Sequence, residues 1–148
     1  MFKRFAVRRM RLRDLDRIEE IERASFGSEA YDRNLFAEYY DTCGSLFLVG
    51  EYHRSICGYM ITCTGGDRAE VISVAVDPAR RGTGVGSSLM ESTLRRLRRR
   101  RIGRLLLMVS EKNETARTFY EKYGFHRIRR APRYYENGDD AWQMSRNV

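Results

Sequence analysis

Apolar positions in the first 45 residues recur every three or four residues, the spacing of one side of a helix. The first predicted helix follows Asp14, a favourable N-cap residue, and ends at Gly27. Its inward positions are Leu15, Ile18, Ile21 and Ser25. Asp32 is expected to cap a second helix with inward positions Leu35, Phe36, Tyr39 and Tyr40. Two amphipathic helices are therefore predicted after a short opening strand at Val7–Met10.

Short apolar runs joined by polar turns come next. We expect strands at residues 46–49, 56–63 and 70–76, because each run is brief and rich in β-branched or aromatic residues. The turns lie at residues 51–55 and 65–67. This spacing predicts an antiparallel meander of three strands.

The spacing of apolar residues along the chain changes again after Asp77 and Pro78. A glycine-rich turn at residues 81–86 opens a helix that Gly103 is expected to close, with inward positions Leu89, Met90, Leu94 and Leu97. The continuous apolar run at residues 105–109 is typical of a strand covered on both faces. A further helix begins near Asn113 and ends at Gly124, with inward positions Ala116, Phe119, Tyr120 and Tyr123. Strands at residues 125–128 and 141–144 are expected to complete the sheet.

Strand, helix and strand in the middle of the chain imply a parallel pair with a right-handed crossover. The predicted fold class is therefore mixed α/β (α+β), with a largely antiparallel sheet and helices on both faces. The 148 residues fit one domain, residues 1–148. A composition of 42% hydrophobic and 32% charged residues excludes a disordered chain.

The few cysteines and histidines limit which metal and catalytic sites the chain can form. Cys43, Cys57 and Cys63 are an odd number without metal-ligand spacing, and we expect free thiols in a reducing cytoplasm. His53 and His126 are far apart, so no metal site and no histidine-centred triad are expected. The basic start at residues 1–5 lacks the apolar stretch of a signal peptide, and no run reaches the roughly 20 apolar residues of a membrane span.

The formal net charge of +8 suits an anionic partner, and its densest source is the arginine run at residues 95–101. A solvated helix face is the favoured interpretation of that run. Contact with nucleic acid or with the ribosome is the alternative. The run contains no aromatic residue that could stack on bases, which weakens a single-strand binding role.

The glycine-rich turn is the strongest chemical signal. It lies directly after an apolar strand and before a helix, where flexible backbone and unpaired helix N–H groups can hold a pyrophosphate. A Walker loop is excluded because no lysine follows the glycines. A Rossmann turn is excluded because a meander precedes it and arginines stand about 20 residues later, where that motif has an acidic residue.

The chain resembles the GNAT superfamily of acetyl-CoA-dependent N-acetyltransferases over nearly its whole length. The first block is Arg/Gln-x-x-Gly-x-Gly/Ala, carried by Arg81, Gly84 and Gly86. The second is Asn-x-x-Ala-x-x-x-Tyr with a following Gly-Phe, carried by Asn113, Ala116, Tyr120, Gly124 and Phe125. A third, more selective block resembles the protein N-terminal acetyltransferases of the RimI and Ard types, and consists of Tyr134, Tyr135, Asn137, Gly138, Asp140, Ala141, Trp142 and Met144.

The resemblance implies a V-shaped opening between the strands that end at Val76 and Val109, with acetyl-CoA lying in it. Main-chain groups of Val74, Ala75 and Val76 would bind the pantetheine arm, and Asn113 would contact the same region. The pyrophosphate would be held by the turn residues Arg81, Gly82, Thr83, Gly84, Val85, Gly86 and Ser87.

Acyl transfer needs a neutral amine, and an α-amine with a pKa of about 7.7–8.0 is roughly a tenth neutral at pH 7, so modest base help suffices. RimI-like enzymes carry a glutamate where this chain has Met108, and Glu111 stands three positions later in an expected loop. Glu70 is the better candidate base. Alternation would place it beside Ile72 and Val74, where apolar neighbours would raise its pKa; the alternative is a carboxylate that faces water. By resemblance, Tyr120 is the acid that protonates the leaving thiolate; the alternative is a core tyrosine.

The resemblance also implies where the acceptor peptide binds. Tyr134 and Tyr135 would hydrogen-bond its backbone, although tyrosines in loops also serve as plain packing. Phe26, Gly27 and Tyr31 would form the first substrate loop, in which the family more often has proline at the position of Gly27.

The leading hypothesis is therefore an enzyme that acetylates protein N-termini, including those of ribosomal proteins, as a monomer or weak dimer without membrane or nucleic-acid partners. Three alternatives stay open. These are a GNAT enzyme for small amines or lysine side chains, a basic nucleic-acid-binding module, and a degenerate CoA binder suggested by Met108.

Overall fold

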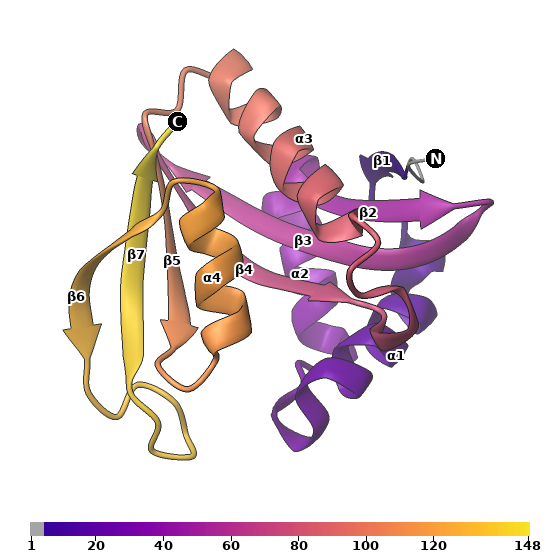
Figure 1. Cartoon of the computed structure of the whole chain (residues 1–148). Coiled ribbons are helices and arrows are strands. Elements are labelled where there is room, and N and C mark those ends of the chain that lie inside the picture. The colour runs from indigo at the N-terminus through magenta and orange to yellow at the C-terminus, as the bar shows by residue number, and fades with distance from the viewer. Residues whose placement is uncertain (1–4) are drawn as a thin grey trace.

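A seven-stranded sheet with the strand order β1-β2-β3-β4-β5-β7-β6 forms the middle layer of the protein (Figure 1). The computed structural model describes residues 5–148, so the basic start at residues 1–4 lies outside the described residues. The strands are β1 (Ala6–Arg9), β2 (Phe47–Tyr52), β3 (Ser55–Gly65), β4 (Arg68–Val76), β5 (Arg104–Ser110), β6 (His126–Ala131) and β7 (Ala141–Asn147). The α-helices are α1 (Leu15–Phe26), α2 (Arg33–Cys43), α3 (Val85–Arg99) and α4 (Glu114–Lys122).

The predicted mixed α/β class is confirmed. Among the described residues, neighbouring strands are antiparallel except β4 and β5, which run parallel and are joined through α3. The last strand, β7, inserts between β5 and β6. Within residues 5–148, no helix is both long enough and apolar enough to cross a membrane.

Helices cover both faces of the sheet, as expected. One core lies under α3 and α4 and includes Leu89, Leu97 and Tyr120. The other lies under α1 and α2 and includes Ile18 and Phe36. The opposite faces of one sheet thus anchor α3 and α4 on one side and α1 and α2 on the other (Figure 1).

Two glycines let α3 and its neighbours approach the sheet closely. A Cβ atom on Gly50 would lie 2.7 Å from Cγ2 of Val85, the first residue of α3. A Cβ atom on Gly58 would lie 2.9 Å from the main-chain oxygen of Ala75. Neither position leaves room for a side chain without movement of α3 or β4. Close packing here fixes the start of α3 against the middle of the sheet.

Three local predictions were wrong in detail. The side chain of Asp14 does not cap α1; it accepts the N–H of Arg11 and pairs with Arg8. Helix α3 ends at Arg99, before Gly103, because Arg101 takes a left-handed conformation with φ 58°. The apolar run in β5 is not covered equally on both faces, since Leu105, Leu107 and Val109 are buried while Leu106 and Met108 are half-buried.

The expectation of three free thiols was wrong. Cys43, at the end of α2, forms a disulfide with Cys63 in β3, and Cys57 is a free, buried thiol. No local pattern predicts this pairing, because the two cysteines are 20 positions apart and only the packing of α2 against β3 brings them together.

Candidate active site

Strands β4 and β5 separate after a short stretch of pairing, which creates the opening expected at the centre of the sheet. In the described part of the chain their parallel register runs only from Arg68–Val71 against Arg104–Leu107. Beyond this point, residues 73–76 of β4 pair with β3, and residues 108–110 of β5 pair with β7. Main-chain groups of Val74, Ala75 and Val76 on the side away from β3 therefore face the opening.

The glycine-rich turn lies at the end of β4 and leads into α3. Gly82 and Gly84 have φ angles of 77° and 99°, which side-chain-bearing residues rarely adopt. Gly84 is the N-cap of α3 and has no side chain to accept hydrogen bonds, so the first amides of the helix, from Val85 on, lack an intrahelical partner. This arrangement offers several N–H groups and the positive helix end to an anion.

Gly86 lines the opening from the first turn of α3. A Cβ atom there would lie 3.6 Å from the ring of Phe119 in α4 and 3.7 Å from Cγ2 of Val76 in β4. Gly86 therefore sits where α3, α4 and the diverging end of β4 meet. A branched side chain would fill the space that leads from the turn into the opening.

Glu70 stands where the two strands are still paired. It is exposed and lies in register with Cys63 on one side and Leu106 on the other. Of the two interpretations of Glu70, the structure thus agrees with a carboxylate that faces water and not with one among buried apolar neighbours. A shallow groove of about 410 Å³ runs beside it and includes Gln143 of β7.

The predicted alternation along β4 was wrong beyond Ile72. Ile61 pairs with Ser73 and Thr62 pairs with Val71, so Ile72 is an extra, unpaired residue in β4. Such a bulge reverses which face the following side chains occupy. Glu70 and Ile72 therefore face α1 and α2, whereas Val74 packs against the core under α3 and α4.

The rings of Tyr31 and Tyr39 pack together, and Glu70 and Tyr134 lie close enough to raise the pKa of both tyrosines; we call these four residues the acceptor cluster. Burial first, and then the nearby Tyr39, Glu22, Tyr134 and Glu70, together raise the pKa of Tyr31 to about 12. The pKa of Tyr39 is raised by burial and then by Glu70, Glu38 and Tyr134. The rings of Tyr31 and Tyr39 have centroids 6.4 Å apart. The cluster therefore unites the first loop, α2, β4 and the loop before β7.

Tyr39 and Glu22 were missed as site residues. Tyr39 was assigned to the inward stripe of its helix, and its neighbours in the site are far away in the sequence. Glu22 lies four residues after Ile18, on the inward stripe of α1, and this buried acidic position was the available signal.

Glu22 holds the first substrate loop in place. Its carboxylate accepts the N–H of Tyr31 at 2.8 Å and the hydroxyl of Tyr59, which also lies 3.1 Å from the hydroxyl of Ser73. Burial raises the pKa of Glu22, while the two hydrogen bonds lower it in part. One buried carboxylate thus joins α1, the loop, β3 and β4.

The start of the same loop explains a departure from the family pattern. Gly27 ends α1 with a φ of 57°, a value that the proline ring cannot reach. Phe26 is 41% exposed at this point. A proline at position 27 would therefore require a different exit from α1.

Tyr120 and Asn113 lie on α4. Tyr120 is buried against the rings of Phe119 and Phe125, and burial raises its pKa, with a further contribution from the nearby Tyr135. Its hydroxyl is therefore protonated at neutral pH. Asn113 caps α4, since its Oδ1 accepts the N–H of Ala116 at 3.1 Å.

The loop between β6 and β7 is tied to the end of β5. The rings of Tyr134 and Tyr135 lie 5.0 Å apart. Asp139 pairs with Lys112 at 2.8 Å, and Arg130 pairs with Glu111 at 2.7 Å. Glu111 is thus held in an ion pair, and Met108 lies half-buried in β5. These contacts fix the two tyrosines relative to the opening.

Comparisons with known proteins agree with this arrangement. The family model "Acetyltransferase (GNAT) family" matches residues 15–125. A Bacillus subtilis protein named as a "putative ribosomal protein bS18-alanine N-acetyltransferase" is 32% identical over 140 residues, which cover 94% of this chain and 93% of that protein.

Two solved structures are similar over the whole fold. The structure of Ard1 from Thermoplasma volcanium has a TM-score of 0.93 and 28% identity, and covers 97% of both chains. A chain of the NatC complex bound to Gag peptide and CoA has a TM-score of 0.87 and 21% identity, and covers 100% of this chain and 99% of that chain.

Proposed function

The chain belongs to the acetyltransferase (GNAT) family and is an N-acetyltransferase, and on this premise we propose that it acetylates the α-amine of protein N-termini with acetyl-CoA as donor. The observation that carries the proposal is the separation of β4 from β5 beyond Val71 and Leu107. The glycine-rich turn lies at one end of the β4–β5 opening, and the acceptor cluster with its four polar side chains lies at the other.

The residues of the turn fit the phosphates of acetyl-CoA. The amides at the start of α3 lack intrahelical partners, Arg81 is exposed beside them, and a side chain at Gly86 would obstruct the space. We assign the pyrophosphate to Arg81, Gly82, Thr83, Gly84, Val85, Gly86 and Ser87. The main chain of Val74, Ala75 and Val76 would bind the pantetheine arm as an extra strand would, and the amide of Asn113 would contact it across the opening.

Direct attack of the amine on the thioester accounts for the chemistry. A C–N bond forms as the C–S bond breaks, the amine loses a proton, and the thiolate gains one. Glu70 is the proposed acceptor of the amine proton through a water molecule, because it is exposed at the base of the opening. Tyr120 is the proposed donor to the thiolate, since its raised pKa keeps its hydroxyl protonated.

The acceptor cluster suits an N-terminal peptide. Tyr31, Tyr134 and Tyr135 offer hydroxyl groups to a peptide backbone, and Tyr39 adds a fourth from α2. Phe26 and Gly27 shape the entrance at the end of α1. The Bacillus subtilis relative is named for the alanine of a ribosomal protein, which supports ribosomal proteins as acceptors here.

A panel of short peptides that vary in their first two residues tests the proposal. We expect acetyl transfer to peptides with a free N-terminus and none to the same peptides with a blocked N-terminus and an internal lysine. Transfer to the blocked peptides would support lysine acetylation instead. Binding of acetyl-CoA without transfer to any peptide or small amine would support a degenerate enzyme.

A further inference from the structure

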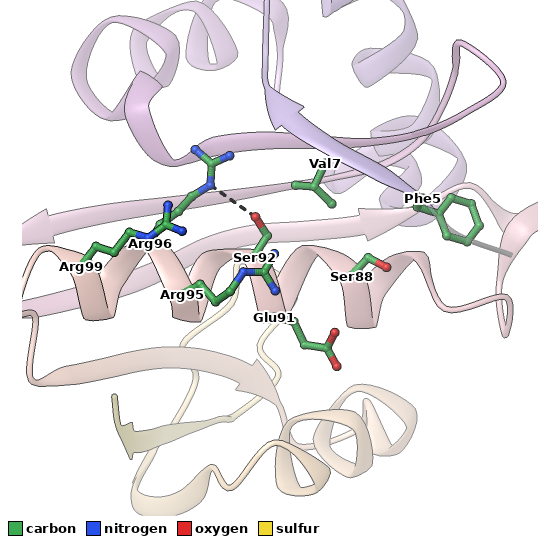
Figure 2. Close-up of a pocket in the computed structure, with 8 residues that line it drawn as sticks. All are labelled: Phe5, Val7, Ser88, Glu91, Ser92, Arg95, Arg96 and Arg99. Carbon is green, nitrogen blue, oxygen red and sulfur yellow. Dashed lines mark hydrogen bonds between the residues drawn. The ribbon is translucent and has the colours of Figure 1, made fainter. Parts of the chain in front are cut away.

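A second polar cavity lies on the opposite side of α3 from α4, beside the edge strand β1 (Figure 2). We call it the arginine groove. It has a volume of about 280 Å³ and is lined by Phe5, Val7, Ser88, Glu91, Ser92, Arg95, Arg96 and Arg99. The α3 residues recur every three or four positions and so form one stripe. The groove therefore runs along the helix axis, and Arg95 lies about 15 Å along that axis from the start of the helix.

Within the described part of the chain, the guanidinium groups of the groove lack acidic partners. Elsewhere arginines are paired, for example Arg17 with Asp77 at 2.6 Å and Arg130 with Asp140 at 2.6 Å. Among the side chains that the structure describes, no ion pair involves the groove arginines Arg95, Arg96 and Arg99, nor the neighbouring Arg9 of β1 and Arg100, the residue after α3. Glu91 is the acidic residue of the lining, and its carboxylate accepts the hydroxyl of Tyr123 on the α4 side.

The unpaired charges of these arginines destabilise the charged form of Arg96. It is half-buried, and its Nε donates to the hydroxyl of the buried Ser92 at 3.3 Å. Burial lowers its pKa, and the charges of Arg99, Arg100, Arg9 and Arg95 lower it further. A polyanion in the groove would relieve this repulsion and would gain several charge-assisted hydrogen bonds.

The chemistry of the lining favours phosphates in a row. Guanidinium forks bind phosphate in bidentate geometry, and Arg95 and Arg99 stand one helical turn apart, about 6 Å along the axis. The aromatic residue of the lining, Phe5, is only 9% exposed and offers no free ring for stacking on bases. The groove therefore suits the backbone of a duplex better than the bases of a single strand.

We propose that the arginine groove binds the phosphate backbone of double-stranded RNA. The choice of RNA over DNA rests on the proposed function, because contact with structured RNA would hold the enzyme near ribosomal acceptors. The favoured interpretation of the arginine run as a solvated face is thereby revised. Its exposed residues do face solvent, but they gather beside a groove that leaves their charge unpaired.

Binding is measured by fluorescence polarisation with a labelled 20-base-pair RNA duplex between 50 and 200 mM KCl. We expect the logarithm of the affinity to fall with the logarithm of salt with a slope of about −4. The double substitution Arg95→Gln and Arg99→Gln should weaken binding about 10–100-fold at 100 mM KCl and reduce the slope by about 2. The matched control, Arg13→Gln with Arg129→Gln, removes the same charge from exposed positions outside the groove and should change affinity less than about threefold.

Three further arms separate the alternatives. Saturating CoA should leave RNA binding unchanged, and displacement by CoA would instead assign these arginines to the cofactor. Equal affinity for a DNA duplex would overturn the choice of RNA, and displacement by polyglutamate would overturn nucleic acid altogether. Acetylation of a short peptide should be unchanged in the double variant, which also confirms folding. RNA binding is read without acetyl transfer, so its failure and failure of the proposed function are distinguishable.

Discussion

Glu22 and Tyr31 are joined by a hydrogen bond of 2.8 Å from the main-chain N–H of Tyr31 to the buried carboxylate of Glu22. The bond closes the loop between α1 and α2, and the same carboxylate accepts the hydroxyl of Tyr59 in β3. A residue outside the opening thus determines where one member of the acceptor cluster lies.

Substitution Glu22→Ala should lower the free energy of unfolding by about 1–3 kcal/mol, because it leaves a buried N–H without its acceptor and opens a cavity. It should also raise KM for a peptide acceptor more than it changes the affinity for acetyl-CoA. The control is Glu20→Ala, which removes an exposed glutamate from the same helix and should cost about 0–1 kcal/mol. Urea unfolding and steady-state kinetics measure both effects. Equal KM values in the two variants would contradict a positioning role for Glu22.

The sequence alone was sufficient to predict the position of those parts of the candidate site that are built from contiguous residues. The turn at residues 81–87 and the stretch from Asn113 to Tyr120 lie where the pattern placed them, since local glycine conformation and helical spacing define both.

The acceptor side depended on tertiary structure. The bulge at Ile72 reverses the side-chain alternation of β4, and no turn residue or change of period marks it. Tyr39 and Glu22 resemble ordinary members of inward stripes until α1 and α2 are packed on the sheet. The Cys43–Cys63 disulfide likewise follows from the position of α2 against β3.

Acid should selectively remove the contribution of Asp14. Burial alone would raise the pKa of this carboxyl, but hydrogen bonds from Arg8 and from the N–H of Arg11 lower it below its ordinary value of 3.8. A carboxyl with a lowered pKa stabilises the fold above its unfolded pKa and loses that effect as pH falls through its folded pKa. The stability difference between the parent and Asp14→Asn should therefore be full between about pH 5 and 7 and narrow below about pH 4. Urea midpoints from pH 2.5 to 7 test this, and a difference independent of pH would refute it.

Glu70→Gln should lower kcat while the affinity for acetyl-CoA stays nearly unchanged. The substitution keeps the size of an exposed side chain but removes its ability to accept a proton. General-base help is typically worth about 10²–10⁴-fold, and the weakly basic α-amine places the expected loss at the low end of that range. Arg68→Gln, an exposed position two residues earlier on β4, is the control. Full activity of Glu70→Gln from pH 6 to 9 would remove Glu70 from the mechanism.

Tyr120→Phe should reduce kcat by about tenfold and leave the fold nearly intact. The ring is buried between Phe119 and Phe125, so phenylalanine preserves its packing while the proton donor is lost. A thiolate with a pKa of about 8.5 leaves readily, which limits the effect. Tyr123→Phe is the matched control at the C-cap of the same helix, where the hydroxyl donates to Glu91 instead. Similar rates for the two variants would mean that Tyr120 serves only as core.

Gly84→Val and Gly86→Val should abolish binding of acetyl-CoA for two different reasons. At Gly84, a φ of 99° strains any branched residue and would distort the first turn of α3. At Gly86 the backbone is helical, but the new methyl groups would occupy the space between Val76 and Phe119. The control is Gly66→Val, which separates the effect of conformational strain from the effect on ligand binding. Gly66 also has a positive φ, of 63°, but it lies in the turn before β4 with open space around it. At an acetyl-CoA concentration of 100 times the dissociation constant, the ligand should stabilise the parent and Gly66→Val by about 2.7 kcal/mol. It should not stabilise Gly84→Val or Gly86→Val. Thermal unfolding with and without acetyl-CoA measures this stabilisation. If acetyl-CoA stabilised Gly84→Val or Gly86→Val as much as the parent, that glycine would be excluded from the phosphate site.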